Sequence, residues 1–273
     1  MTIFSCEENR EDGQCYETDP MGKRKARMTN LGGSGGSYEA VALDDRDTLN
    51  LRFFVTHDNT YGEFRRYTPH KRAVRRAMRH ENYWDILHSP DGTMEYLVVN
   101  PSTENEFQGT YNWTKDITEG KNSAARYFRK AEGLEIDGNL LYFVASKQKE
   151  IFILNLDDNT YSKIYTFSPN FDGQPDGLRM SSNVLYVTEE AKHGNTAGIF
   201  GYDKDNGKLY SIFKSVKWYG DTTGVAFDPT NSRMYFAIQT DGIIFELRRK
   251  DGKPFDGDIM GVKYNAEASK FVR

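Results

Sequence analysis

The sequence predicts an all-β protein, and more specifically a six-bladed β-propeller, from three observations. Aromatic residues make up 14% of the 273 residues, whereas all hydrophobic residues together make up only 37%. This balance fits short, half-buried strands better than long buried helices. A β-prone segment recurs six times along the chain, and further strand-like segments flank the well-formed copies, so the repeating unit is a small antiparallel sheet.

Each copy of the recurring segment is an apolar strand that ends in polar or charged residues. The apolar stretches of the six copies contain Phe4, Phe53, Tyr96, Tyr142, Leu185 and Met234. Successive markers are 43 to 49 residues apart, which is the length of one four-stranded blade. The repeat therefore predicts a propeller over residues 1–255, with a C-terminal tail over 256–273.

The flanking segments complete the predicted blades. Innermost strands are expected at 38–42, 131–134, 175–178 and 222–227, and third strands at 62–67, 150–154, 198–202 and 242–247. The first copy has no strand before it. Either the segment after Phe255 supplies this strand or the first blade is truncated at its N-terminus, and we expect the truncation. Residues 69–84 show no alternation and contain good helix formers, so they predict a helical insertion between the second and third blades.

The charge balance limits the classes of partner. The formal net charge is -4, which predicts no attraction to nucleic acid or to an anionic membrane. No apolar run approaches the roughly 20 residues that a membrane-spanning helix needs. The basic residues within 71–79 could form a patch that binds anions or nucleic acid, but we interpret them as the solvated face of the predicted helix. We therefore expect a monomer that binds a small molecule.

Acidic residues recur at one position of the predicted innermost strands. Glu39, Glu132, Asp176 and Thr223 occupy this position, and a small residue follows each of them. Innermost strands line the axis of a propeller, so the three carboxylates are expected to converge there. Converging carboxylates in a partly desolvated site repel one another unless a cation is bound, and Ca²⁺ is the cation that prefers several oxygen ligands.

The ends of the predicted second strands supply a further ring of polar residues. Its members are Cys6, Glu7, Glu8, His57, Asp58, Asn100, Glu189, Glu190 and Gln239. Cys6 and Cys15 could pair in a secreted protein, but Cys6 stands beside two carboxylates, so we expect it to be unpaired. A Cys6 thiolate would add a soft ligand suited to a transition metal, whereas the alternative is an inert buried thiol. His57 could act as a general base, but we interpret it as a surface residue.

Several of these segments resemble the motifs of the PhoX-type alkaline phosphatases and their propeller relatives. They include Ser5-Cys6-Glu7-Glu8-Asn9, Tyr38-Glu39-Ala40, Glu132-Gly133, Pro175-Asp176-Gly177 and Thr188-Glu189-Glu190, and the resemblance extends over residues 3 to about 256. It implies a propeller with an axial calcium site, iron bound by the cysteine of the C-E-E motif, and hydrolysis of phosphate monoesters. The implied metal ligands are Cys6, Glu7, Glu39, Glu132, Asp176 and Glu189.

The resemblance leaves alternative functions open. His57-Asp58 stands where relatives often have Glu-Asp, and the chain is shorter than the bacterial enzymes. A calcium-stabilised propeller that binds a ligand or partner without catalysis is one alternative, and a lactonase-type calcium hydrolase is another. The resemblance also implies a secreted or periplasmic protein whose signal segment lay upstream of the present first residue.

Overall fold

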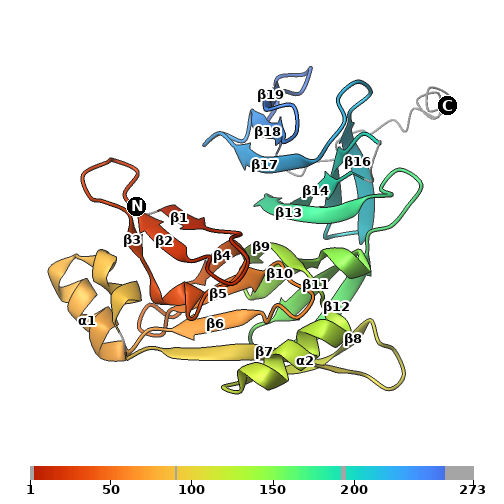
Figure 1. Cartoon of the computed structure of the whole chain (residues 1–273). Coiled ribbons are helices and arrows are strands. Elements are labelled where there is room, and N and C mark those ends of the chain that lie inside the picture. The colour runs from red at the N-terminus through yellow and green to blue at the C-terminus, as the bar shows by residue number, and fades with distance from the viewer. Residues whose placement is uncertain (1–2, 90, 192–194, 256–273) are drawn as a thin grey trace. The chain divides into compact units, whose positions relative to one another are not determined.

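The structure is a computed structural model that describes residues 3–89, 91–191 and 195–255. Antiparallel strands dominate these residues, so the predicted all-β class is confirmed (Figure 1). The chain divides into two compact units. Unit 1 runs to Phe167 and includes 174–178, and unit 2 comprises 168–173 and the residues from Arg179 onward. The predicted tail over 256–273 lies outside the described residues.

A small three-stranded sheet opens unit 1. Its strands are β1 (Ile3–Cys6), β2 (Cys15–Thr18) and β3 (Arg27–Met28), which pair in chain order. The antiparallel register of β1 and β2 places Cys6 opposite Cys15. An isolated bridge between Glu8 and Ser37 connects the end of β1 with the start of the next sheet.

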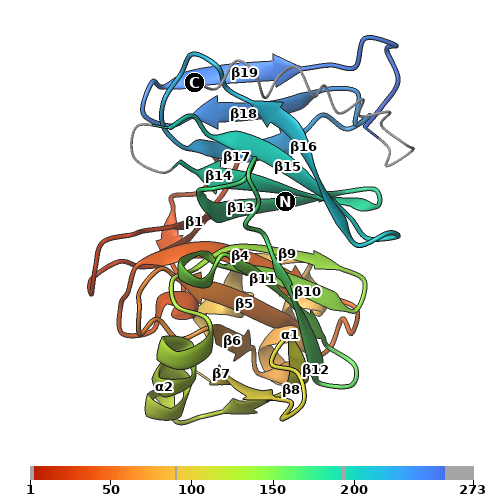
Figure 2. The same ribbon diagram turned by 90° about the vertical axis from the view of Figure 1, so that its right-hand side faces the viewer.

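The main sheet of unit 1 contains nine strands. They are β4 (Tyr38–Asp44), β5 (Arg52–His57), β6 (Arg65–Thr68), β7 (Thr93–Pro101), β8 (Gln108–Thr114), β9 (Ala131–Asp137), β10 (Leu140–Ala145), β11 (Glu150–Asn155) and β12 (Thr160–Tyr165). Their order in the sheet is β4-β5-β6-β7-β8-β12-β11-β10-β9. The first and last strands of this order, β4 and β9, lie next to one another (Figure 2).

The third copy of the sequence repeat shares a sheet with the second. Its strand β7 pairs with β6, with Tyr96 opposite Arg65, and β8 then joins β7 to β12. The sequence before Tyr96 supplies no innermost strand, because the 3-10 helix η2 (Tyr83–His88) occupies that segment. Asp85, the acidic residue of this segment, therefore lies on a helical turn.

Two α-helices cover parts of unit 1. The predicted insertion is present as α1 (Lys71–His80), followed by η2. The second helix, α2 (Ile117–Tyr127), was not expected from the sequence. The side chain of Asp116 caps it by accepting a hydrogen bond from Thr118 N at 2.8 Å, and the helix packs against β7. Among the described residues, no helix is long and apolar enough to cross a membrane.

Aromatic side chains form much of the core of unit 1. Phe143 stacks on Phe152 with ring centroids 4.8 Å apart, and Phe64 lies 4.7 Å from Phe143. All three rings are completely buried. These residues come from β6, β10 and β11 or the segments beside them, so the core holds the two halves of the nine-stranded sheet together.

Unit 2 is built from two further antiparallel sheets. The first contains β13 (Gln174–Ser181), β14 (Val184–Glu190), β15 (Gly198–Asp203) and β16 (Lys208–Lys214), and the second contains β17 (Thr222–Phe227), β18 (Met234–Ile238) and β19 (Ile243–Leu247). Strand β13 begins within unit 1 and ends within unit 2. Buried residues such as Tyr186, Ile199 and Phe236 form the core of this unit.

A carboxylate cluster as the candidate metal centre

The acidic residues of β4 and β9 lie at β-bulges. Between Tyr38 and Val41 the strand β4 has one more residue than its partner β5, and β9 has the same irregularity between Ala131 and Leu134. A bulge kinks the strand and changes the direction of its side chains. Glu39 and Glu132 are the residues that follow the start of each bulge, so the same local irregularity positions both carboxylates.

Three carboxylates meet in unit 1, as the sequence predicts. Glu39, Glu132 and Asp176 each contribute one carboxylate oxygen, and these atoms lie within 4.8 Å of one another. Glu132 is buried, with 7% of its surface exposed, and the other two are half-buried. Burial without compensation is costly for a carboxylate.

The small residue after Glu132 permits the close approach of the third acid. A Cβ atom added to Gly133 would lie 2.4 Å from the backbone oxygen of Asp176 and 2.6 Å from the nitrogen of Leu178. No residue with a side chain fits this contact without movement of the backbone. The pattern of an acid followed by a small residue thus has a steric reason here.

Two further acids flank the cluster. The carboxyl of Glu8 contacts that of Glu39 and raises its pKa, and the charge of Asp58 acts on Glu132. Asp58 also forms an ion pair with Lys130, with 3.0 Å between Nζ and Oδ1. The sequence analysis includes Glu8 and Asp58 among the polar residues at the ends of the second strands, but not among the metal ligands. The bridge of Glu8 with Ser37, which precedes β4, explains why Glu8 reaches the cluster.

The pKa values of the cluster show how strongly the ionised forms are disfavoured. Burial raises the pKa of Glu39 to about 10, and the contact with Glu8 and the charges of Asp176 and Glu132 add to this effect. Burial and the charges of Asp58 and Asp176 raise the pKa of Glu132 to about 9, although Ser146 donates a hydrogen bond to its Oε1 at 2.9 Å. A bound cation would remove this penalty.

The donor set of the cluster fits a hard cation. All of the ligand atoms available from Glu39, Glu132, Asp176 and Glu8 are carboxylate oxygens, and Ca²⁺ is bound by sets of oxygen ligands. The buried carboxyls with raised pKa are the part of the structure that a divalent cation would stabilise. The residues present therefore fit calcium.

The prediction that Cys6 is a metal ligand is wrong. Cys6 forms a disulfide with Cys15, whose side chain is completely buried. The two residues are direct partners in the antiparallel register of β1 and β2, which brings their Cα atoms to 4.1 Å. A disulfide sulfur carries no thiolate charge, so the soft ligand on which the iron site depended is missing.

Glu7 also has a different role from the predicted one. Its side chain is exposed, and its Oε2 accepts a hydrogen bond from the backbone nitrogen of Gln14 at 3.1 Å. The backbone nitrogen of Glu7 donates a hydrogen bond to the backbone oxygen of Gln14 at 2.9 Å. Glu7 therefore closes the connection between β1 and β2, and its neighbour Glu8 is the residue that faces the carboxylate cluster.

Glu189, the remaining predicted ligand, is a structural residue of unit 2. Both of its carboxylate oxygens are occupied: Gly173 N donates to Oε1 at 2.9 Å, and Gly198 N and Lys214 Nζ donate to Oε2, each at 2.8 Å. The residue is completely buried. The Lys214 ammonium and two backbone nitrogens thus compensate this carboxylate, and Glu189 is not part of the cluster of Glu39, Glu132 and Asp176, so the structure gives no support to the prediction that it is a metal ligand.

His57 supports the strand that carries Glu39, and it is buried rather than on the surface. Its ring packs on Tyr38 with centroids 5.2 Å apart, and its Nδ1 lies 3.5 Å from Glu63 Oε2. Burial would raise the pKa of Glu63, but the interactions with His57 and Arg65 hold it at about 2. The guanidinium of Arg65 also stacks over the ring of Tyr38 at 4.6 Å. This ionic network fixes the start of β4.

Similarity to known proteins is found among solved structures and not among sequences. No protein-family model matches the sequence, and no curated protein sequence is significantly similar to it. Among solved structures, PhoX of Pseudomonas fluorescens, determined in complex with the transition-state analogue vanadate, aligns with a TM-score of 0.66 at 14% identity. The alignment covers 89% of this chain and 58% of PhoX, so the chain spans less than two thirds of that protein's length.

A second alignment agrees on the architecture. A chain of the nidogen/laminin complex aligns with a TM-score of 0.51 at 12% identity over 91% of this chain and 78% of its own. The calcium-binding protein regucalcin of Agrobacterium tumefaciens aligns over 46% of this chain with a TM-score of only 0.30. The alignments with PhoX and with the nidogen/laminin chain confirm the propeller fold predicted from the repeat, and at 14% and 12% identity they show the fold alone.

Proposed function

We propose that this protein is a calcium-dependent phosphoesterase whose centre is the cluster of Glu39, Glu132 and Asp176. The observation that carries the proposal is the convergence of these three carboxylates from distant parts of the sequence into one partly buried site. The fold-level similarity to PhoX supports the choice of phosphate esters as substrates. A bound calcium ion would supply positive charge to the phosphoryl oxygens of the substrate.

The residues of the chain have separate roles in this proposal. Glu39, Glu132 and Asp176 hold the cation, and Glu8 adds a carboxylate beside Glu39. Ser146 orients Glu132 by donating to Oε1, which leaves the second oxygen of that carboxylate for the cation. Lys130 supplies positive charge close to Glu132, since its charge lowers the pKa of that residue.

Iron does not form part of this proposal. Cys6 is bound in a disulfide, and the described cluster offers oxygen ligands only. The disulfide instead supports an oxidising location, such as the outside of a cell or a periplasm, because disulfides persist there. The substrate would then be a small phosphorylated molecule of that environment.

Metal binding and turnover are both tested with the variant Glu132→Gln and its control Glu119→Gln. Protein freed of metal with a chelator is titrated with calcium by calorimetry, and hydrolysis of p-nitrophenyl phosphate is then measured. We expect calcium to bind and to restore activity, and Glu132→Gln to lower activity by about 100-fold or more. Glu119→Gln, which removes an exposed carboxylate of α2, should change neither measurement.

The two readouts separate the alternatives. Calcium binding that depends on Glu132, without hydrolysis of phosphate monoesters or of a lactone panel, would contradict the phosphoesterase and favour a calcium-stabilised binding module. The loss of the soft ligand Cys6 to the disulfide is the observation that favours this second candidate. Absence of calcium binding to the folded protein would overturn both candidates.

A further inference from the structure

Helix α1 has a strongly basic exposed surface. Five of its ten residues are Lys or Arg, and all five are exposed: Lys71, Arg72, Arg75, Arg76 and Arg79. The spacing of Arg72, Arg75, Arg76 and Arg79 places them on one side of the helix. Among the described residues, none of the five forms an ion pair, in contrast to the paired arginines of the main sheet.

A second basic segment, far away in the sequence, lies beside the first. The connection between β2 and β3 contains Lys23, Arg24, Lys25 and Arg27, all exposed. Arg24 donates to Asn82 Oδ1 at 3.4 Å and lies 5.3 Å above the ring of Trp84. Arg27 pairs with Asp85 at 3.2 Å. These contacts hold the connection against the residues that follow α1.

The two segments form one basic surface, defined as 19–28 together with 70–88. These residues include nine Lys or Arg and three Asp or Glu, a formal charge of +6 in a chain whose formal net charge is -4. The expectation of no attraction to an anionic surface was based on the net charge and on the interpretation of residues 71–79 as a solvated helix face. The structure concentrates the positive charge in one place, so the local field there has the opposite sign to the whole molecule.

Large apolar side chains project from the same surface. Met21 is 72% exposed, Met28 and Tyr83 are each 56% exposed, and Met78 on α1 is 40% exposed. An exposed methionine or tyrosine is ordinary when it is single. Four of them in the two segments that also carry nine cations are a combination typical of surfaces that bind at a lipid headgroup region.

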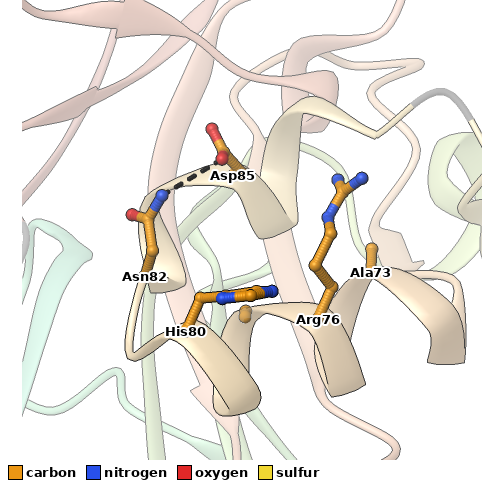
Figure 3. Close-up of a pocket in the computed structure, with 6 residues that line it drawn as sticks. Ala73, Arg76, His80, Asn82 and Asp85 are labelled. Atoms are coloured by element: carbon orange, nitrogen blue, oxygen red, sulfur yellow. Dashed lines mark hydrogen bonds between the residues drawn. The ribbon is translucent and has the colours of Figure 1, made fainter.

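A small pocket of about 130 Å³ opens between α1 and the residues that follow it. Arg76 and His80 project into it from the helix, opposite Asn82 and Asp85, which hydrogen-bond to one another (Figure 3). A headgroup phosphate at this pocket would contact the Arg76 guanidinium, which has no ion-pair partner among the described residues. Asp85 is already partnered by Arg27, which limits its repulsion of an anion.

We propose that the basic surface docks this protein peripherally onto an anionic lipid bilayer. The cations would neutralise lipid phosphates and carboxylates, while the exposed methionines and Tyr83 enter the headgroup region. The apolar side chains favour a membrane over nucleic acid, because three of the four are methionines and offer no flat ring for stacking on bases. The proposal is independent of the activity of the carboxylate cluster.

Sedimentation with vesicles tests the proposal. We expect binding to vesicles of phosphatidylcholine containing about one third phosphatidylserine, no binding to phosphatidylcholine alone, and release of the protein by salt at about 0.5 M. Replacing Arg72, Arg75 and Arg79 together by Gln should lower the partition coefficient by about 100-fold. Glutamine is a good helix former, and these side chains are exposed, so the variant should fold.

Two comparisons make the result specific. Replacing three exposed cations at α2, Lys115, Lys121 and Arg126, by Gln removes the same charge and should leave vesicle binding unchanged. Met78→Ser should weaken vesicle binding without weakening any binding to a DNA oligonucleotide. Equal loss in both triple variants, binding to neutral vesicles, or tighter binding to the oligonucleotide than to anionic vesicles would overturn the proposal.

Discussion

The carboxylate of Glu189 is completely buried in unit 2, and its environment shows what such a group requires. Burial raises its pKa, whereas Lys214 and the backbone nitrogens of Gly173 and Gly198 act in the opposite direction. Among the described residues, the ammonium of Lys214 is the only charged group that forms an ion pair with Glu189, at 2.8 Å from its Oε2. The stability of this part of unit 2 should therefore depend on the lysine.

Replacing Lys214 by Met tests this dependence. The variant leaves the Glu189 carboxyl buried without its cation, so we expect unfolding to become easier by about 1–3 kcal/mol, a range reduced because Lys214 is partly exposed. Chemical denaturation measures the change. Lys208→Met, at the exposed start of the same strand, is the control and should have little effect. If Lys214→Met is as stable as this control, the backbone donors alone satisfy Glu189.

At the scale of elements, the carboxylate cluster depends on the backbone of β9. Gly133 follows Glu132 at the bulge, and its lack of a side chain allows the backbone of Asp176 to pack closely against it. The repeat of an acid and a small residue was visible in the sequence, and it correctly predicted which acids converge. The selection of Glu8 rather than Glu7 was not predictable, because it depends on how the connection after β1 turns toward Ser37.

Gly133→Ala tests the element-scale requirement. The added methyl group would force the backbone of Asp176 away from β9, so we expect calcium affinity to fall by about 10-fold or more while the protein remains folded. Titration calorimetry measures the affinity. Gly138→Asn is the matched control: Gly138 is a turn residue of the same hairpin with φ +60, nothing lies near its added Cβ, and asparagine accepts this conformation. Similar affinities for the two variants would contradict the role of the close contact.

At the scale of the whole molecule, the repeat period predicted the fold class but not every sheet. Four of the six markers lie in second strands, as the repeat predicts, namely in β5, β10, β14 and β18. Phe4 lies in β1, the first strand of its sheet in the described residues, and Tyr96 lies in β7, between β6 and β8 in the nine-stranded sheet. A period in the sequence predicts where strands occur, but it does not predict which strands they pair with in a sheet. The unpredicted α2 lies in a segment whose Gly120 and polar residues give a weak helical signal, and packing of Gly120 against Tyr96 stabilises it there.

Whether Cys6 and Cys15 form a disulfide also depends on strand pairing rather than on the local sequence. Cys6 and Cys15 are nine residues apart, and a disulfide between them requires that β1 and β2 be paired in one particular register. The neighbouring carboxylates suggested a metal site instead, but the side chain of Cys6 packs toward the core that contains Leu31 and Val74. The direction of a side chain at a strand end follows from the sheet and could not be deduced from its neighbours in the sequence.

The raised pKa values of Glu39 and Glu132 make the stability of the metal-free protein depend on pH. Their pKa values are about 10 and about 9 in the folded chain, against an ordinary value of 4.5. Between about pH 4.5 and pH 9 the unfolded chain has released protons that the folded chain keeps, so this contribution to stability falls as the pH rises. Calcium binds the ionised carboxylates, so its stabilising effect should grow with pH over the same range.

Thermal unfolding at about pH 5 and about pH 8, with a chelator or with calcium, measures both effects. We expect the rise in Tm on adding calcium to be larger at the higher pH. Glu132→Gln removes one of the two groups, so in the chelator its Tm should fall less than that of the natural sequence between the two pH values. The exposed-site variant Glu119→Gln should behave as the natural sequence does. A calcium effect that is equal at both pH values would mean that proton release from the buried carboxyls is not coupled to cation binding.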